Sequence, residues 1–291
     1  MCDPRGSFVP LYCLFRVIKC EVVMYSEAED FAEKEKAFSD MTSCLSNFAG
    51  NDWEEMIKGG MALEIGGSGG LLGGMISNLA GRVICTDIID TQLQYDGQFA
   101  KLLKEKFERN GRSLDLGKIE FHVADAQDLI YRENYFDLVF TQNALEHIPD
   151  PLVAIKESLR VLKPGGILYA TFDPVWTADS GSHFLDFVKD PWLHIILSDD
   201  EFCSRMRKGG AQDWQLTSYR KDMNRLPCAF YRDQVPMLLK NAKITKYKAD
   251  EWSGCVNPSF VNHRNRNKAA KILNCDSSDL LVRGFCFLVV K

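Results

Sequence analysis

The sequence predicts an α/β protein in which a parallel β-sheet is covered by helices. Two observations predict this fold. Between residues 61 and 172, short apolar runs alternate with segments of helical period, and the links between them are short. The first apolar run ends in the glycine-rich turn of residues 64–70 (EIGGSGG), which opens the next helix. With 291 residues, 46% of them hydrophobic, the chain can bury the core of one domain and a cap.

The first half of the chain contains most of the expected elements. Residues 26–58 have the period of a helix that precedes the sheet. Asp150 is a plausible N-cap for the last helix of this half, and residues 163–166 (KPGG) form the turn that ends it. Five short apolar runs predict strands at 61–65, 82–86, 119–123, 136–140 and 167–172. Helices are expected between them at 71–79, 99–109 and 151–162.

After Asp173 the regular alternation stops. Residues 174–224 are rich in aromatic residues, Asp, Gly and Ser and show no clean period, which predicts a cap inserted over the active face. The return to the sheet is then expected as a helix at 232–241, a strand at 243–252, a basic loop at 263–271 and a final strand at 280–290.

Residues 1–25 are expected to form an N-terminal extension to a domain of residues 26–291. The apolar run of residues 8–15 is too short to span a bilayer, and its flanks do not resemble a signal peptide. The ten cysteines include no C-x-x-C pair, and several sit inside apolar runs. We therefore expect no membrane span, no metal site and buried free thiols in a cytoplasmic protein.

The charge balance argues against a general nucleic-acid binder. The formal net charge is -5 and the pI is about 5.6, whereas such proteins usually carry a strong basic surplus. We expect a small molecule as the partner instead. The sequence does not indicate the oligomeric state.

The glycine-rich turn and two acidic residues indicate a nucleotide cofactor. Glycines between a strand and a helix let the backbone approach such a cofactor closely. Asp87 ends the second expected strand, about twenty residues on, where a carboxylate can accept both ribose hydroxyl protons. Asp125 ends the third, where it can bind the adenine amino group while Ala126 leaves room for the ring. Taken alone, the turn also fits a purely structural role or an NAD-dependent dehydrogenase.

A fourth motif makes the order of these residues recognisable. The fourth expected strand runs into residues 141–148 (TQNALEHI), which contain an L-x-H motif, and residues 160–166 (RVLKPGG) follow. The four motifs together resemble class I S-adenosylmethionine-dependent methyltransferases, especially their broad small-molecule group, over residues 60–173 and the terminal strand pair. This resemblance implies a Rossmann-like, seven-stranded, mostly parallel sheet with an antiparallel last strand and helices on both faces.

The resemblance also implies roles for the turn residues in binding S-adenosylmethionine. The acid of the first strand and the glycines hold the methionine moiety in that family, so Glu64, Gly66 and Gly70 inherit this role. Ser68 stands where the family usually has its middle glycine. Serine is small, but it can strain the backbone or displace the cofactor slightly.

The same resemblance assigns the remaining cofactor contacts to the ends of the other strands. Asp87 would bind the ribose. The further expected contacts are Asp125 and Ala126 at the adenine, and Thr141, Gln142 and His147 beside the methionine end.

Two histidines, His183 and His147, are the candidates for catalysis. Because histidine titrates near neutral pH, we hypothesise that His183 deprotonates an acceptor hydroxyl, with Asp179 or Asp186 orienting it. The alternative is that the histidines of this region are only hydrogen-bonded within an aromatic cap. O-methylation of a small-molecule acceptor is favoured, and N- or C-methylation stays open.

Other readings of the sequence stay open as well. An NAD-dependent oxidoreductase expects the spacing G-x-G-x-x-G, which the turn does not supply. A non-catalytic cofactor-binding partner of another subunit is the third class of function. Five aromatic residues could wall an acceptor pocket or form the core of the cap: Phe172, Trp176, Phe184, Phe187 and Trp192.

Overall fold

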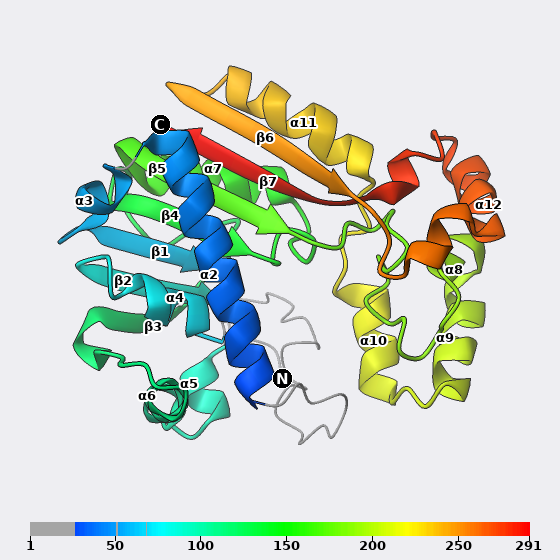
Figure 1. Ribbon diagram of the computed structural model, residues 1–291, viewed down its shortest axis with the longest axis horizontal. Helices are drawn as coiled ribbons and strands as arrows, with labels where there is room; N and C mark the ends of the chain where they lie inside the picture. Colours follow the sequence, from blue (N-terminus) through cyan, green and yellow to red (C-terminus); the bar gives the residue numbers. More distant parts are fainter. Residues whose placement is uncertain (1–26, 51, 68) are drawn as a thin grey trace.

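A seven-stranded sheet forms the centre of the computed structural model, which describes residues 27–50, 52–67 and 69–291 (Figure 1). The strand order is β3-β2-β1-β4-β5-β7-β6, and β7 runs antiparallel to both of its neighbours. The predicted sheet, mostly parallel with an antiparallel last strand, is confirmed. The strands are β1 (Met61–Ile65), β2 (Arg82–Asp87), β3 (Ile119–Val123), β4 (Phe136–Gln142), β5 (Leu162–Phe172), β6 (Lys246–Ser253) and β7 (Val282–Val290).

The middle of the sheet brings three strand ends together. β1 pairs in parallel with β2 on one side and with β4 on the other, so Ile65 lies opposite both Thr86 and Thr141. The residues that follow these positions therefore gather at one edge of the sheet. In doubly wound α/β proteins, ligands bind in the crevice outside the carboxyl ends of the strands.

Helices cover both faces of the sheet because the buried side chains of its strands alternate. Ala62 and Leu138 pack with the buried face of α2 and its neighbours, whereas Leu63 and Val139 pack against the opposite layer. The first layer contains α2 (Glu27–Ala49), α3 (Trp53–Ile57), α4 (Leu71–Ile76) and α6 (Phe99–Arg109), and the second contains α7 (Pro151–Val161) and α11 (Cys228–Lys240). The predicted helices on both faces are confirmed.

Several element boundaries differ from the expected ones. The long helix expected at residues 26–58 is divided into α2 and α3, and α11 begins four residues before the expected start. The turn expected at 163–166 is part of β5, because Gly165 and Gly166 hydrogen-bond with the C-terminal Lys291. Asp150 caps α7 as expected, since its carboxylate accepts from the N–H groups of Leu152 and Val153. Short helical segments complete this half: α5 (Thr91–Gln94) and η1 (Leu116–Lys118).

Between β5 and α11 the chain leaves the sheet and forms a helical cap. Its helices lie on the side toward which the arrowheads of the parallel strands point (Figure 1). Trp176, Phe202, Met206 and Tyr219 fill a core of its own. Its helices are α8 (Leu193–Ile196), α9 (Asp199–Lys208) and α10 (Asp213–Lys221).

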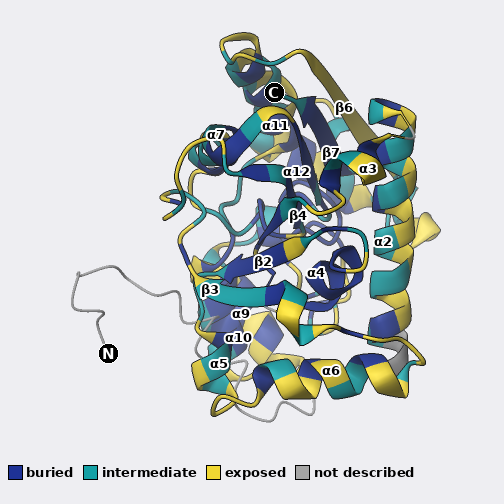
Figure 2. Ribbon diagram, turned by 90° about the vertical axis from the view of Figure 1, so that its left-hand side faces the viewer, coloured by how far each residue is buried: buried dark blue, intermediate teal, exposed yellow. Residues whose placement is uncertain are grey.

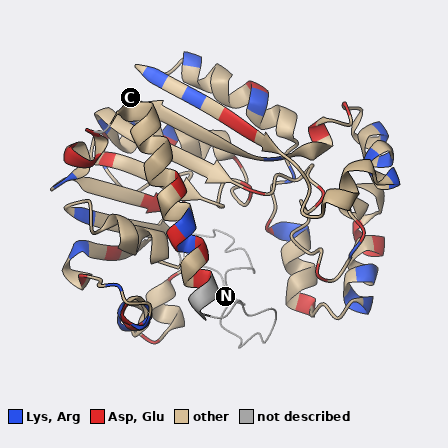
Figure 3. Cartoon of the chain, viewed as in Figure 1, with Lys and Arg blue, Asp and Glu red and all other residues tan. Residues whose placement is uncertain are grey.

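A second segment contributes to the same cap, and it corrects one expectation. The basic stretch expected as a loop at 263–271 is the helix α12 (Arg264–Leu273), which lies beside α8 in Figure 1. It is helical because Ala269 and Ala270 bury an apolar stripe against Trp192, while its Lys and Arg residues remain on the outside (Figure 3). The short η2 (Pro258–Asn262) and η3 (Asp279–Leu281) flank it.

One edge strand of the sheet is exposed, and the N-terminal part of the chain lies outside the described residues. All eight residues of β6, the edge strand beside β7, are exposed (Figure 2). Within the described residues, no helix has the length and apolar character needed to cross a membrane. The expected extension of residues 1–25 lies outside the described residues.

Candidate active site

The glycine-rich turn after β1 adopts a conformation that requires glycine. Gly66 has a φ of +74°, and a Cβ atom added to it would lie 2.5 Å from the Cβ atom of Ala144. The N–H of Gly67 donates to the carbonyl of Thr86 at 2.9 Å, which ties the turn to the end of β2. Gly70, with a φ of +62°, caps α4 and packs its backbone near Phe121. Ser68 lies outside the described residues.

The carboxyl group of Glu64 holds this turn in place through hydrogen bonds. Its side chain is buried, and Oε2 accepts hydrogen bonds from the N–H of Gly73 and the thiol of Cys85, both at 3.1 Å. Burial raises the pKa of the Glu64 carboxyl, and these two donors lower it in part. Glu64 therefore positions the turn and the start of α4, and its direct contact with a cofactor stays a prediction.

Asp87 and Asp125 lie at the same edge of the sheet. Asp87 ends β2 opposite Val123 of β3, and its Oδ1 accepts from the N–H of Ile89 at 3.1 Å. Asp125 follows β3 directly, is exposed, and accepts from the N–H of Gln127 at 2.8 Å. A small surface cavity lined by Gly67 and Asp87, among others, opens beside the glycine-rich turn. The positions fit the ribose and adenine roles predicted for these carboxylates, with the half-buried Ala126 beside Asp125.

The end of β4 adds polar groups beside the turn. Thr141 is buried, and its hydroxyl has no hydrogen-bond partner in the structure. The ammonium of Lys34, from α2, donates to Oε1 of Gln142 at 3.3 Å. The charge of Lys34 also lowers the pKa values of both Glu64 and Glu146, which places it near both carboxyls. Sequence reasoning missed Lys34, because one lysine in a helix of mixed charge carries no signal of a site.

These groups fit the cofactor that the resemblance implies. We call the carboxyl ends of β1, β2, β3 and β4, with the turn, the strand-end site. Gly66 lets the turn pack directly against Ala144, and among the described residues no atom lies within 4 Å of a Cβ atom placed at Gly69. The orphaned hydroxyl of Thr141 lacks a partner that a bound polar group can supply. The carboxylates suit the hydroxyls of a nucleoside, and Lys34 suits a carboxylate.

Beyond the strand-end site, Glu146, His147 and His183 form what we call the acceptor-end cluster. One imidazole nitrogen of His147 lies 3.9 Å from a carboxyl oxygen of Glu146, and the two imidazole rings are 5.2 Å apart at an interplanar angle of 64°. His147 comes from the loop after β4 and His183 from the cap. Asn224 holds that loop in place, since its side-chain amide donates to the carbonyls of Leu145 and Ile148.

The environment shifts the pKa values of two groups in this cluster. Glu146 is almost fully buried, and burial raises its pKa to about 8. Desolvation by the surrounding chain lowers the pKa of His183, and the adjacent His147 lowers it further, although one edge of His183 remains exposed to solvent. His183 also has a φ of +62°, a conformation that is strained for a residue other than glycine.

The structure corrects the orientation proposed for His183. Among the described residues, no hydrogen bond or ion pair joins His183 to Asp179 or Asp186. Asp179 is buried and accepts instead from the N–H of Val256 at 2.8 Å, while Asp186 is exposed. The sequence could not show this, because His147 reaches His183 from a segment 36 positions earlier in the chain.

The aromatic residues considered for a pocket wall lie mainly in hydrophobic cores. Trp176 and Phe184 are buried in the core of the cap, and Phe187 packs against it. Trp192 is fully buried against α12, and Phe172 packs against Tyr231 of α11 at 4.6 Å between ring centroids. The core reading of these residues is therefore the one that the structure supports.

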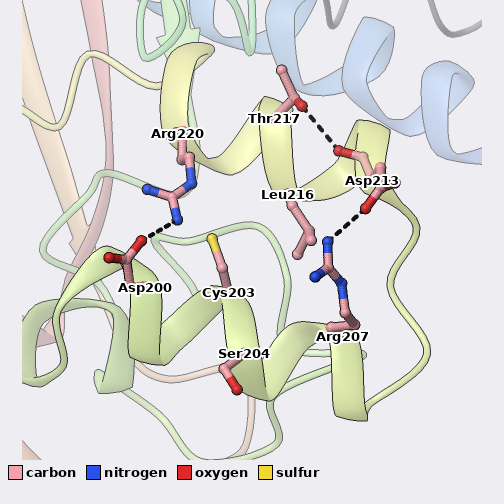
Figure 4. Close-up of a pocket in the computed structure, with 8 residues that line it drawn as sticks. All are labelled: Asp200, Cys203, Ser204, Arg207, Asp213, Leu216, Thr217 and Arg220. Carbon is pink, nitrogen blue, oxygen red and sulfur yellow. Dashed lines mark hydrogen bonds and ion pairs between the residues drawn. The ribbon is translucent and has the colours of Figure 1, made fainter.

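A separate cavity of about 450 Å³ lies between α9 and α10, away from the strand ends (Figure 4). Its two guanidinium groups are already paired, Arg220 with Asp200 and Arg207 with Asp213, each at 2.6 Å. None of the predicted site residues lines this cavity. We therefore place the chemistry at the strand ends and not here.

Fold and site together describe an α/β protein with a candidate cofactor site at the carboxyl ends of its parallel strands. Residues 63–170 match the protein-family model described as a methyltransferase domain. Over these residues the chain is similar to methyltransferase domains, in agreement with the resemblance to the class I S-adenosylmethionine-dependent group. The match covers the glycine-rich turn, both acidic strand ends and the L-x-H motif.

Similar proteins agree with this assignment. The ubiquinone/menaquinone biosynthesis C-methyltransferase UbiE of Pseudomonas putida is 35% identical over 114 residues, which are 38% of this chain and 41% of that protein. The chloroplastic tocopherol O-methyltransferase of Arabidopsis thaliana is 30% identical over 141 residues, 48% of this chain and 34% of that protein. The chain thus spans less than half the length of these curated relatives.

One solved structure supports the fold over almost the whole chain. Phosphoethanolamine N-methyltransferase 2 of Haemonchus contortus, in complex with S-adenosyl-L-methionine, superimposes with a TM-score of 0.52 at 18% identity. The superposition covers 99% of this chain and 61% of that one. At this identity the likeness concerns the fold alone.

Proposed function

We propose that this protein transfers a methyl group from S-adenosylmethionine to a small-molecule acceptor, with a hydroxyl as the favoured target. One observation carries the proposal: the strand-end site and a pair of adjoining imidazoles lie along the same edge of the sheet. The first supplies the groups that a nucleoside and an amino acid require. The second lies where an acceptor would lose its proton.

Each end of the strand-end site has a distinct role. Asp87 and Asp125 would accept hydrogen bonds from the ribose hydroxyls and the adenine amino group, with Ala126 leaving room for the ring. The turn at Gly66 and Gly70 would let the backbone approach the methionyl group. Thr141 and Gln142 would border the same group, and Lys34 would pair with its carboxylate, because its ammonium already reaches Gln142.

The acceptor end has to orient the acceptor and take up a proton. When bound, S-adenosylmethionine supplies a sulfonium methyl group, which passes to the acceptor oxygen as the carbon–sulfur bond breaks with its electrons on sulfur. Positioning alone can lower such a barrier by about 7–11 kcal/mol in favourable systems, and a placed base adds about 10²–10⁴-fold. The imidazole of His147, on the loop after β4, and the imidazole of His183, on the cap, are the candidate proton acceptors.

The acceptor's chemistry is a proposal that rests on the histidine pair. The names of the curated relatives include both a C-methyltransferase and an O-methyltransferase, so they favour neither reaction. A hydroxyl acceptor needs a proton acceptor as its oxygen attacks, and the adjoining imidazoles supply one. This requirement favours O-methylation of a small molecule.

The cofactor half of the proposal is tested by calorimetry. We expect S-adenosylhomocysteine to bind the protein, NAD not to bind, and Asp87→Ala to weaken the binding at least tenfold. Asp115→Ala is a matched control, because Asp115 is an acidic cap at the opposite end of β3. Binding of NAD in place of S-adenosylhomocysteine would contradict the proposal.

The assignment of Lys34 has its own matched pair. Lys34→Met should weaken S-adenosylhomocysteine binding several-fold, with the loss greatest at low ionic strength. Lys36→Met should leave binding unchanged, because Lys36 is exposed and pairs only with Asp40 on the same helix. Equal affinities of the two variants would remove Lys34 from the site.

The acceptor half is tested by transfer of a labelled methyl group into metabolite extracts. A labelled small molecule whose methyl group is on oxygen would support the proposal. His183→Gln should lower its rate of formation at unchanged affinity for S-adenosylhomocysteine. Label found only on nitrogen or carbon would overturn the preference for a hydroxyl.

A further inference from the structure

The acceptor-end cluster has the composition and spacing of a metal site. Glu146, His147 and His183 each offer one ligand atom, and these three atoms lie within 4.8 Å of one another. Two imidazole nitrogens and one carboxylate oxygen form a ligand set that catalytic zinc sites use, with the fourth position open. The sequence did not reveal the cluster, because expectations for zinc rested on paired cysteines.

A backbone carbonyl already orients the imidazole of His147. Nδ1 of His147 is 2.8 Å from the carbonyl oxygen of Asp222. A carbonyl can only accept, so this nitrogen carries the proton and Nε2, the atom that faces Glu146, keeps its lone pair. The backbone carbonyl of Pro174 lies near enough to the imidazole of His183 to raise its pKa in part. Metal-binding histidines are usually held in this way.

Glu146 supplies the second, independent observation. The residue is 1% exposed, and among the described residues neither carboxyl oxygen has a hydrogen-bond partner. Burying a carboxyl group without partners is costly, so such a group in a folded protein needs an explanation. A cation bound between Glu146 and the two imidazoles would supply the missing partner.

We propose that Glu146, His147 and His183 bind one divalent transition-metal cation, with Zn²⁺ as the best match to the ligands. Bonds of about 2.0–2.2 Å to such an ion require the three ligand atoms to draw closer together. His183 is the ligand able to move, because its side chain is exposed and its backbone conformation is strained.

The site would give the acceptor a defined place, and this consequence rests on the proposed function. With the cation bound, an acceptor hydroxyl at the open position would be acidified and would lose its proton to water, so the imidazoles would act as ligands in place of the proton acceptors that the metal-free site offers. The charge of Asp173, which pairs with Arg283, and the charge of Lys34 both act on Glu146, in opposite directions. Binding of the cation itself requires neither the cofactor nor the acceptor.

Cobalt binding to the full chain tests the site directly. The protein is stripped with a chelator, and Co²⁺ is added without cofactor while its visible absorption and binding heat are followed. We expect one Co²⁺ per chain, displaced by Zn²⁺, and at least tenfold weaker binding in Glu146→Gln and in His183→Gln. His122→Gln is the matched control, because His122 also lies beside a glutamate but hydrogen-bonds to Tyr131.

The outcomes separate the metal site from the proposed function. Binding that is absent, or equal in wild type, Glu146→Gln and His183→Gln, overturns the metal site. Thermal melting and S-adenosylhomocysteine binding of each variant show that it is folded. Normal Co²⁺ binding in a protein that does not bind S-adenosylhomocysteine would leave the metal site standing and remove the proposed function.

Discussion

Glu64 and Glu146 are two buried glutamates at opposite ends of the same site, and they differ in their partners. Glu64 is 6% exposed and accepts from the N–H of Gly73 and the thiol of Cys85. Glu146 is 1% exposed, and within the part of the chain that the structure describes neither of its carboxyl oxygens has a hydrogen-bond partner. Burial raises the pKa of both carboxyls. The satisfied carboxyl supports the fold, whereas the unsatisfied one is available to a ligand.

The comparison teaches that burial alone does not identify a functional acid. From the sequence alone, Glu64 was assigned a role in binding the methionine moiety, whereas Glu146 was only part of the L-x-H motif. In the structure, Glu64 hydrogen-bonds beneath the turn, and Glu146 is the glutamate whose carboxyl oxygens lack hydrogen-bond partners among the described residues. The two glutamates therefore differ in the hydrogen-bond partners of their carboxyl groups, although they share residue type and burial.

The largest expected effect concerns the turn that Glu64 supports. Gly66→Val should weaken S-adenosylhomocysteine binding by about two orders of magnitude, because a branched side chain at a φ of +74° costs about 1–3 kcal/mol and its Cβ atom would overlap Ala144. Calorimetry measures the affinity. Gly165→Val is the control: Gly165 has a φ of +81°, with free space around it, and lies far from the strand ends.

Equal loss of affinity in Gly66→Val and Gly165→Val would show that the effect is general destabilisation. The turn would then not be the place where the cofactor approaches the backbone.

An intermediate effect tests the glutamate pair itself. Glu64→Leu should lower the free energy of unfolding by about 1–3 kcal/mol, because it leaves the N–H of Gly73 buried without an acceptor. Glu146→Leu should be neutral or stabilising in the metal-free protein, because it removes an unsatisfied buried group. Urea unfolding of both variants measures the difference. A larger loss in Glu146→Leu would contradict the contrast between the two residues.

The smallest expected effect concerns the cap, where His194 is fully paired. Its Nε2 donates to the carbonyl of Trp176 at 2.8 Å. Burial and the charge of Arg225 together lower its pKa from 6.5 to about 4, against the opposite effect of the Trp176 hydrogen bond. The unfolded chain therefore takes up a proton before the folded one does. Stability is present above pH 6.5 and is lost as the pH falls toward 4.

Between pH 7.5 and pH 5, this histidine should account for a loss of about 1–2 kcal/mol in the free energy of unfolding. His194→Gln keeps a donor toward Trp176 and should remove that part of the pH dependence. Denaturant unfolding at both pH values measures it. An unchanged pH dependence in the variant would show that His194 does not carry the effect.

The sequence predicted the sheet and the strand-end residues because these depend on local signals. A parallel strand has to be apolar, the turn after it needs glycine at Gly66, and Asp87 and Asp125 follow directly where their strands end. Once the strand order is known, the parallel pairing of neighbouring strands brings these residues to the same edge of the sheet. Most of the candidate cofactor site could therefore be proposed from the sequence, and its contacts with a cofactor stay predictions.

The rest depends on contacts between distant segments. Lys34 reaches Gln142 from a helix 108 positions earlier, and His183 meets His147 only because the cap folds over the end of β4. The sequence predicts a loop where α12 forms, because polar residues dominate this segment and its apolar stripe is short. No local pattern contains these pairings.

The cap is built from two separate stretches of the chain, one after β5 and one between β6 and β7. Its two parts meet where Trp192 packs against Ala269 and Ala270. A truncation that removes residues 174–224 would therefore not leave a clean minimal domain, because α12 would keep an uncovered apolar stripe. Any attempt to graft this cap onto another sheet would have to transplant both segments together.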